Sequence, residues 1–90
     1  MIQVQTVEDV YPALDEVVAE LNAAGQSRLA TIFHHRMHEV AWTARSELFD
    51  ELRDVLSDVL KSDAGKLAVE LKQQMERVLV VVRDYVEAQP

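Results

Sequence analysis

The chain has 90 residues, 49% of them hydrophobic, which predicts one folded domain with a single core rather than a disordered polymer. Sixteen acidic residues against nine basic ones give a formal net charge of −7, which disfavours nucleic acid and anionic membrane surfaces as partners and favours a basic protein. The absence of cysteine excludes disulfides, thiolate metal sites and a cysteine nucleophile.

Targeting and membrane-spanning patterns are not found in the sequence. Residues 1–6 lack a basic region followed by an apolar stretch, so we expect no signal peptide. The longest apolar run, residues 78–82, is bounded by Arg77 and Arg83 and is too short to span a bilayer. The expected location is therefore the cytoplasm.

The first predicted helix runs from a cap at Thr6 or Asp9 to about Ala24, with Pro12 close to its first turn. Gly25 is expected to end this helix in a left-handed conformation. Apolar residues that recur at spacings of three and four predict its core face. These residues are Val10, Leu14, Val17, Val18 and Leu21.

The second and third predicted helices follow with short connections. Ser27 is expected to cap the second helix, and Thr43 or Ser46 the third, which runs to about Lys61. The inward positions of the second helix are Leu29, Ile32, Phe33, Met37 and Val40. Those of the third helix are Leu48, Leu52, Val55, Leu56 and Val59.

Asp63 is expected to cap the fourth helix, with Gly65 in its first turn. One face of this helix is apolar: Leu67, Leu71, Met75, Val78, Val82 and Tyr85. Short connections between helices predict an all-α, up-down antiparallel four-helix bundle. The variant is a three-helix fold in which a long second helix is kinked at Trp42 and Thr43. Residues 2–7 and 78–82 also resemble strands, but the helical spacing from 67 to 85 favours helix there.

The third helix carries five carboxylates within an arc of roughly 100°, opposite its leucine face. We call these residues the acidic stripe: Glu47, Asp50, Glu51, Asp54 and Asp58. Like charges four positions apart cost a few tenths of a kcal/mol each, and this cost indicates that the stripe faces something positive. On the first helix, Asp9, Glu16 and Glu20 also face away from the core and are expected to extend the acidic surface. The alternative is an ordinary solvated face of an acidic protein.

Trp42 is the only tryptophan. If the second helix ran on through this residue, the indole would point into solvent. Two alternatives follow: the helix breaks before Trp42 and the ring packs into the bundle, or the ring is exposed and anchors an interface. We favour the first, because a threonine that can cap the next helix follows directly.

Three histidines, His34, His35 and His38, lie within one predicted turn and a half, and two of them are four apart, a spacing that can ligate zinc. They point away from the apolar face, and no acidic residue completes the set locally, so the sequence predicts a polar surface and no metal. Carboxylates in helical bundles can also build di-metal sites, but Glu47, Asp50, Glu51 and Asp54 face away from the leucine stripe.

The C-terminal half of the fourth helix is apolar on nearly all sides. Val69 and Val80 lie on its otherwise polar side, and Leu79 and Val81 adjoin them. A bundle of this size has difficulty surrounding such a helix, which favours a homodimer through these four residues. The alternative is scattered surface valines.

The stretch Trp42-Thr43-Ala44-Arg45-Ser46-Glu47-Leu48, followed by Leu52, resembles small acidic helical bacterial proteins of the immunity type, which accompany toxins. The resemblance implies a protein that binds and neutralises a partner, usually a basic nuclease. Together with the acidic stripe, it favours a non-enzymatic immunity- or antitoxin-like inhibitor that needs no cofactor. The stripe would mask a basic cleft of the partner, and Trp42 would anchor the edge of this interface. The alternatives are a metal-dependent hydrolase that uses the bundle carboxylates and a plain oligomerising structural domain.

Overall fold

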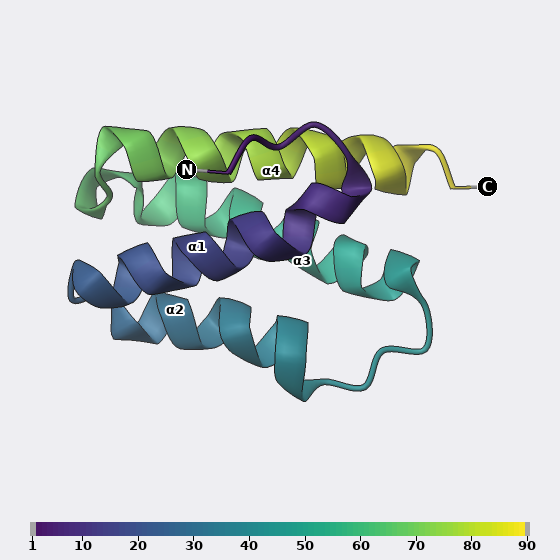
Figure 1. The fold of residues 1–90 in the computed structure, drawn as a ribbon, viewed down its shortest axis with the longest axis horizontal. Helices are drawn as coiled ribbons and strands as arrows, with labels where there is room; N and C mark the ends of the chain where they lie inside the picture. Colours follow the sequence, from purple (N-terminus) through teal and green to yellow (C-terminus); the bar gives the residue numbers. More distant parts are fainter. Residues whose placement is uncertain (1, 90) are drawn as a thin grey trace.

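The computed structural model describes residues 2–89, and this part of the chain contains four α-helices (Figure 1). The helices are α1 (Val10–Ala23), α2 (Ser27–His34), α3 (Arg45–Ser62) and α4 (Val69–Glu87). Three short turns accompany them: η1 (Val7–Asp9), η2 (His35–Glu39) and η3 (Ala64–Lys66). The described residues contain no strand, so the all-α prediction is confirmed and residues 78–82 are helical.

The helices pack in three main pairs: α1 on α2, α3 on α4, and α1 on α4. Their shared interior holds most of the residues predicted to face inward. Five of these residues are only partly buried at its edge: Val18, Ile32, Val55, Leu67 and Tyr85. Val40 is half-buried and is not part of this core cluster. The largest fully buried side chains come from all four helices: Leu14, Leu21, Phe33, Phe49, Leu52, Leu56 and Met75. None of the helices in the described range is long and apolar enough to cross a membrane.

The first helix ends as predicted. Gly25 adopts a φ of +79°, the left-handed conformation that glycine takes without steric cost. At this turn the N–H of Gln26 donates to the carbonyl of Leu21 over 2.8 Å, which satisfies one of the last helical carbonyls. At the other end, the carboxylate of Asp9 accepts the backbone N–H groups of Gln5 and Thr6, both over 2.9 Å.

Three predicted helix caps are wrong. Gln26 precedes α2 and Ala44 precedes α3, and neither Ser27 nor Thr43 nor Ser46 supplies a side-chain cap. The Thr43 hydroxyl instead donates to the Glu47 carboxylate.

The start of the fourth helix also differs from the prediction. Asp63 is the residue that ends α3, and its carboxylate lies 3.2 Å from the Lys66 ammonium. Gly65 belongs to η3, and α4 begins only at Val69, after Ala68 in an extended conformation. The bond from the Lys66 N–H to the Asp63 carbonyl closes a separate turn between α3 and α4.

Between α2 and α3 the chain makes one turn of π-helix, η2, with Met37 buried beneath it. Val40 follows in an extended conformation, with φ −99° and ψ 133°. The helix therefore stops before Trp42, and α3 starts afresh at Arg45, so the three-helix variant with one long kinked helix is wrong.

Residues 2–6, the N-terminal segment, are neither helix nor strand. The segment runs along α4, and Figure 1 shows it lying beside that helix. Its Ile2 N–H donates to the Glu16 carboxylate of α1 over 2.7 Å, and the Gln74 amide of α4 donates to the Ile2 carbonyl over 2.7 Å. Gln74 is 1% exposed, so this amide reaches the segment from within the bundle.

Candidate protein-binding surface

The acidic stripe lies along the outer side of α3, opposite the buried residues Leu52 and Leu56. Asp50 and Asp54 have side chains 56% and 66% exposed, and Asp58 and Glu47 are exposed as well. Glu51 is the most covered of the five, with 39% of its side chain exposed. The structure therefore brings the five predicted carboxylates onto one accessible helix face.

Two arginines contact the stripe. Arg53 lies 3.3 Å from Asp50 and 3.4 Å from Asp54, while Arg36 of η2 lies 2.8 Å from Glu51. The Arg36 pair joins the π-turn to α3 and gives Glu51 a structural role. Five carboxylates against these two guanidinium groups and the exposed Lys61, which falls on the same face of α3, leave a net charge of −2 (−5 + 2 + 1). Exposed pairs of this kind are weak, so the carboxylates remain available to a partner.

The acidic residues predicted on the first helix do not extend the stripe. The Glu16 carboxylate is half-buried and accepts the Ile2 N–H, beside the segment that Gln74 of α4 also holds. Asp9 is likewise engaged, by the backbone of Gln5 and Thr6. Glu20 is exposed on α1, a helix that packs on α2 and α4. The accessible acidic surface is therefore a feature of α3.

Trp42 lies in the extended connection before α3 and is half-buried. Its indole N–H donates to the Arg36 carbonyl over 2.5 Å, and its ring packs against the edge of the core. The prediction that the helix breaks before Trp42 and lets the ring pack is confirmed. Its role as a partner anchor stays a prediction.

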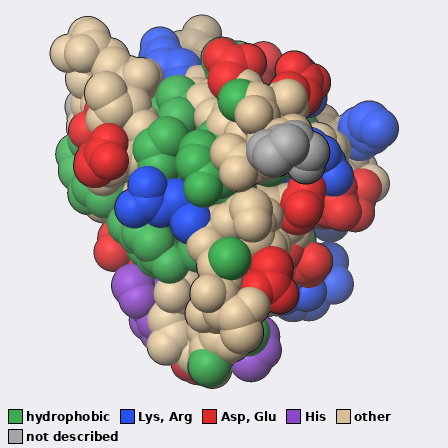
Figure 2. Space-filling model, turned by 90° about the vertical axis from the view of Figure 1, so that its right-hand side faces the viewer, with side chains coloured by type: hydrophobic (Ala, Val, Ile, Leu, Met, Phe, Trp, Pro, Cys, Tyr) green, Lys and Arg blue, Asp and Glu red, His purple; other side chains and the backbone are tan. Residues whose placement is uncertain are grey.

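Two shallow hollows lie near Trp42 and Arg45, and the sequence pattern predicts neither of them. A shallow hollow beside Trp42 is lined also by Tyr11, Arg45 and Leu48, and a second hollow on the other side of Arg45 is lined by Val81 and Tyr85. Figure 2 shows hydrophobic side chains gathered around basic ones on this end of the molecule. The break after η2 brings Trp42 to the same hollow as Tyr11, which helical periodicity does not reveal.

The histidines have carboxylate partners, contrary to the expectation. His35 and His34 lie 3.0 and 3.7 Å from Glu39, and His38 lies 2.8 Å from Asp15 of α1. The hydrogen bond with His35 lowers the pKa of Glu39 below its ordinary value. Asp15 is 23 positions from His38, so the spacing along a single helix does not pair the two residues. In the part of the chain that the structure describes, no group of three or more such side chains is placed to hold a metal ion.

The four residues predicted to form a dimer interface do not share one surface. Val69 and Val80 are 59% and 54% exposed on α4, whereas Leu79 is 8% exposed. Val81 is partly buried and lies beside Val7 and Tyr85, on a different side of the helix. An interface on α4 would therefore centre on Val80 and the edge of Leu79.

Comparisons with known proteins find no family model, curated protein or solved structure that matches the chain. The resemblance of residues 42–52 to immunity-type proteins thus stays a prediction.

Proposed function

We propose that the chain is a protein-binding module whose acidic stripe docks on a basic surface of another protein, and that it acts as an immunity- or antitoxin-like inhibitor of a basic toxin or nuclease. The observation that carries the proposal is the alignment of Asp50, Asp54 and Asp58, all exposed, along one face of a single rigid helix. Residues selected only for stability would alternate in sign there, because like charges one turn apart repel.

Electrostatics would act mainly on the rate at which such a complex forms. A row of like charges produces a field that orients a basic partner before contact, and salt screens this field over about 10 Å at 0.1 M ionic strength. Association should therefore slow as salt is added, while the dissociation rate depends on the few side chains that become buried. We expect Trp42, in the connection before α3, to become buried in the interface when the complex forms.

The proposal includes two finer points about the protein. We propose an up-down antiparallel order of the four helices, supported by the packing of α1 on α2, α3 on α4 and α1 on α4. We also propose a cytoplasmic location, because an inhibitor of this class must meet its target before the target acts on the cell. Protease accessibility in fractionated cells tests the location.

A charge-reversal pair tests the binding surface. Asp54→Lys places a cation in the middle of the stripe, and Glu70→Lys makes the same change of net charge on an exposed residue of α4. Tagged versions of both variants and the unaltered chain are incubated with native lysate at low salt and eluted with a salt gradient. We expect a basic protein to be retained by the unaltered chain and by Glu70→Lys, and lost with Asp54→Lys.

The outcome depends on both variants being folded, which circular dichroism and the thermal midpoint establish. Exposed substitutions of this kind should leave the free energy of unfolding within about 0.5 kcal/mol of the original value. Equal capture by Asp54→Lys and Glu70→Lys, or no salt-sensitive capture by any of the three proteins, would show that the stripe is only a solvated face.

A further inference from the structure

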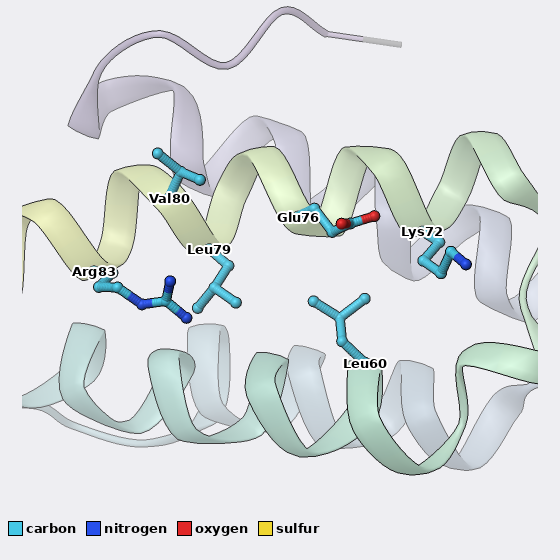
Figure 3. A pocket seen from close by; sticks show the side chains of 6 residues that line it. All are labelled: Leu60, Lys72, Glu76, Leu79, Val80 and Arg83. Carbon is cyan, nitrogen blue, oxygen red and sulfur yellow. The ribbon is translucent and has the colours of Figure 1, made fainter.

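A shallow groove runs between α3 and α4 on a face that the proposed function does not use. Leu60 of α3 and Leu79 of α4 form its apolar floor, and Val80 lies beside it, 54% exposed. Figure 3 shows Leu60 rising from α3 toward α4, with Leu79 and Arg83 projecting from α4 toward α3. Glu76 and Lys72 follow along the same rim. The groove therefore combines an apolar centre with charged ends.

The charges on this side of α4 alternate in sign. Lys72, Glu76, Arg83 and Glu87 fall within an arc of roughly 60° on the helix, at 100° per residue. Among residues 2–89, no ion pair joins any of the four to another side chain. Their positions are symmetric about the midpoint between Leu79 and Val80. Glu76 mirrors Arg83 and Lys72 mirrors Glu87, so each residue mirrors one of opposite charge.

We propose that a second copy of this chain docks on this face, with its α4 antiparallel to the first α4 and the two-fold axis between Leu79 and Val80. Glu76 of each copy would then face Arg83 of the other, and Lys72 would face Glu87. With a rise of 1.5 Å per residue, Glu76 and Arg83 each lie about 5 Å from the axis along the helix. Every ion pair forms twice, because an isologous interface repeats each contact.

The apolar centre of the groove fits the same arrangement. The two Val80 side chains and the exposed edges of the two Leu79 side chains would meet around the axis, between the charged pairs. Covering Val80 removes from water one of the three large apolar side chains that the described surface exposes. A single pair of facing helices is at the small end of stable interfaces, so the association should be reversible and depend on concentration.

The charge order selects one register among the alternatives. A shift of one helical turn in one direction brings Lys72 opposite Arg83, and in the other direction it brings Glu76 opposite Glu87. A parallel arrangement in the same register places each charge against its own copy. Like charges in these positions repel, so the pattern both favours the antiparallel pair and disfavours its neighbours.

A charge-swap experiment tests the proposal. Glu76→Arg and Arg83→Glu each convert the two Glu76–Arg83 contacts of the dimer into repulsions. Mixing the two variants restores opposite charges at both contacts of the mixed dimer, and the double variant carrying both changes restores them within one sequence. The matched controls are Glu70→Arg and Arg77→Glu, which make the same net charge changes at exposed positions of α4 outside the groove.

Sedimentation equilibrium over a range of concentrations measures the association. We expect each single variant to raise the dissociation constant of the dimer by about tenfold or more, and the controls to change it little. The equimolar mixture and the double variant should return it toward the original value. Circular dichroism checks that all variants are folded.

Three results would overturn the proposal. The unaltered chain could stay monomeric at every concentration up to about 1 mM, which would place any dissociation constant well above about 1 mM. The single variants could associate as strongly as the controls. The mixture of single variants could remain monomeric although both are folded, which would show that Glu76 and Arg83 do not face each other. The proposal does not depend on the acidic stripe, so it stands or falls separately from the proposed function.

Discussion

Replacing Gln74 with methionine tests how the N-terminal segment is held. The Gln74 side chain is 1% exposed, and its amide donates to the Ile2 carbonyl over 2.7 Å. Methionine keeps the unbranched shape, a similar size and a similar helix propensity, but it cannot donate a hydrogen bond. The change therefore removes one end of the attachment, while the bond from Ile2 to Glu16 remains.

The size of the effect follows from the hydrogen bond. A neutral bond of this kind contributes about 0.5–1.5 kcal/mol net, and a buried carbonyl left without a partner costs about 1–3 kcal/mol. Ile2 is only half-buried, so water can reach its carbonyl in part once the amide is gone. We therefore expect the free energy of unfolding to fall by about 1–2 kcal/mol. For a domain of this size the thermal midpoint should fall by about 5–15 °C.

Gln73→Met is the matched control, because Gln73 is the preceding residue of the same helix and is exposed. Thermal unfolding followed by circular dichroism compares the two variants with the unaltered chain, and hydrogen exchange of residues 2–6 reports on the segment itself. Exchange there should accelerate in Gln74→Met only. If both variants melt together with the unaltered chain and exchange at residues 2–6 is unchanged, the Gln74 bond does not hold the segment.

Three further predictions concern single positions. Gly25→Ala should destabilise the protein by about 1–2 kcal/mol in urea unfolding, because a φ of +79° is strained for alanine. A steric clash is not the cause, since no atom lies within 4 Å of the added Cβ. An unchanged urea midpoint would contradict this prediction. Trp42→Phe should cost about 1 kcal/mol in the same assay through the lost bond to the Arg36 carbonyl, and equal stability would show that this bond contributes nothing. The backbone N–H groups of Gln5 and Thr6 lower the pKa of Asp9 below its ordinary 3.8, so its contribution to stability is complete above about pH 4 and is lost as pH falls through the folded pKa. Asp9→Asn should therefore reduce the pH dependence of the thermal midpoint below about pH 4, and an unchanged slope would refute the assignment.

Sequence periodicity predicted the helices well where the core determines them. The apolar positions of α1 and α4 alternate every three and four residues, and residues such as Leu14, Val17, Met75 and Val78 are buried as expected. Gly25 marked a turn that requires a positive φ, so its role was also readable from the sequence. Both signals are local and depend on one helix or one dihedral angle.

Features that depend on distant residues were missed. The bond that attaches the N-terminal segment joins residues 72 positions apart. Residues 2–7 alternate like a strand because about half of their side chains pack on the helical core instead of on a sheet. The carboxylate partner of His38 lies on α1, and the π-turn that directs Glu39 to His35 has no distinct periodicity. The predicted cap at Thr43 failed for a local reason, because its hydroxyl donates to the Glu47 side chain four positions further on.

The bond between Gln74 and Ile2 also bears on the order in which the chain folds. The α1–α2 and α3–α4 pairs join neighbouring segments, so the entropic cost of bringing them together is small, whereas closing a loop of 72 residues costs more. We expect the two helix pairs to form and meet first, and the first residues of the chain to dock onto the assembled α4 afterwards. In the reverse direction these residues should leave first, which would open the seam between α1 and α4 before the rest of the bundle unfolds.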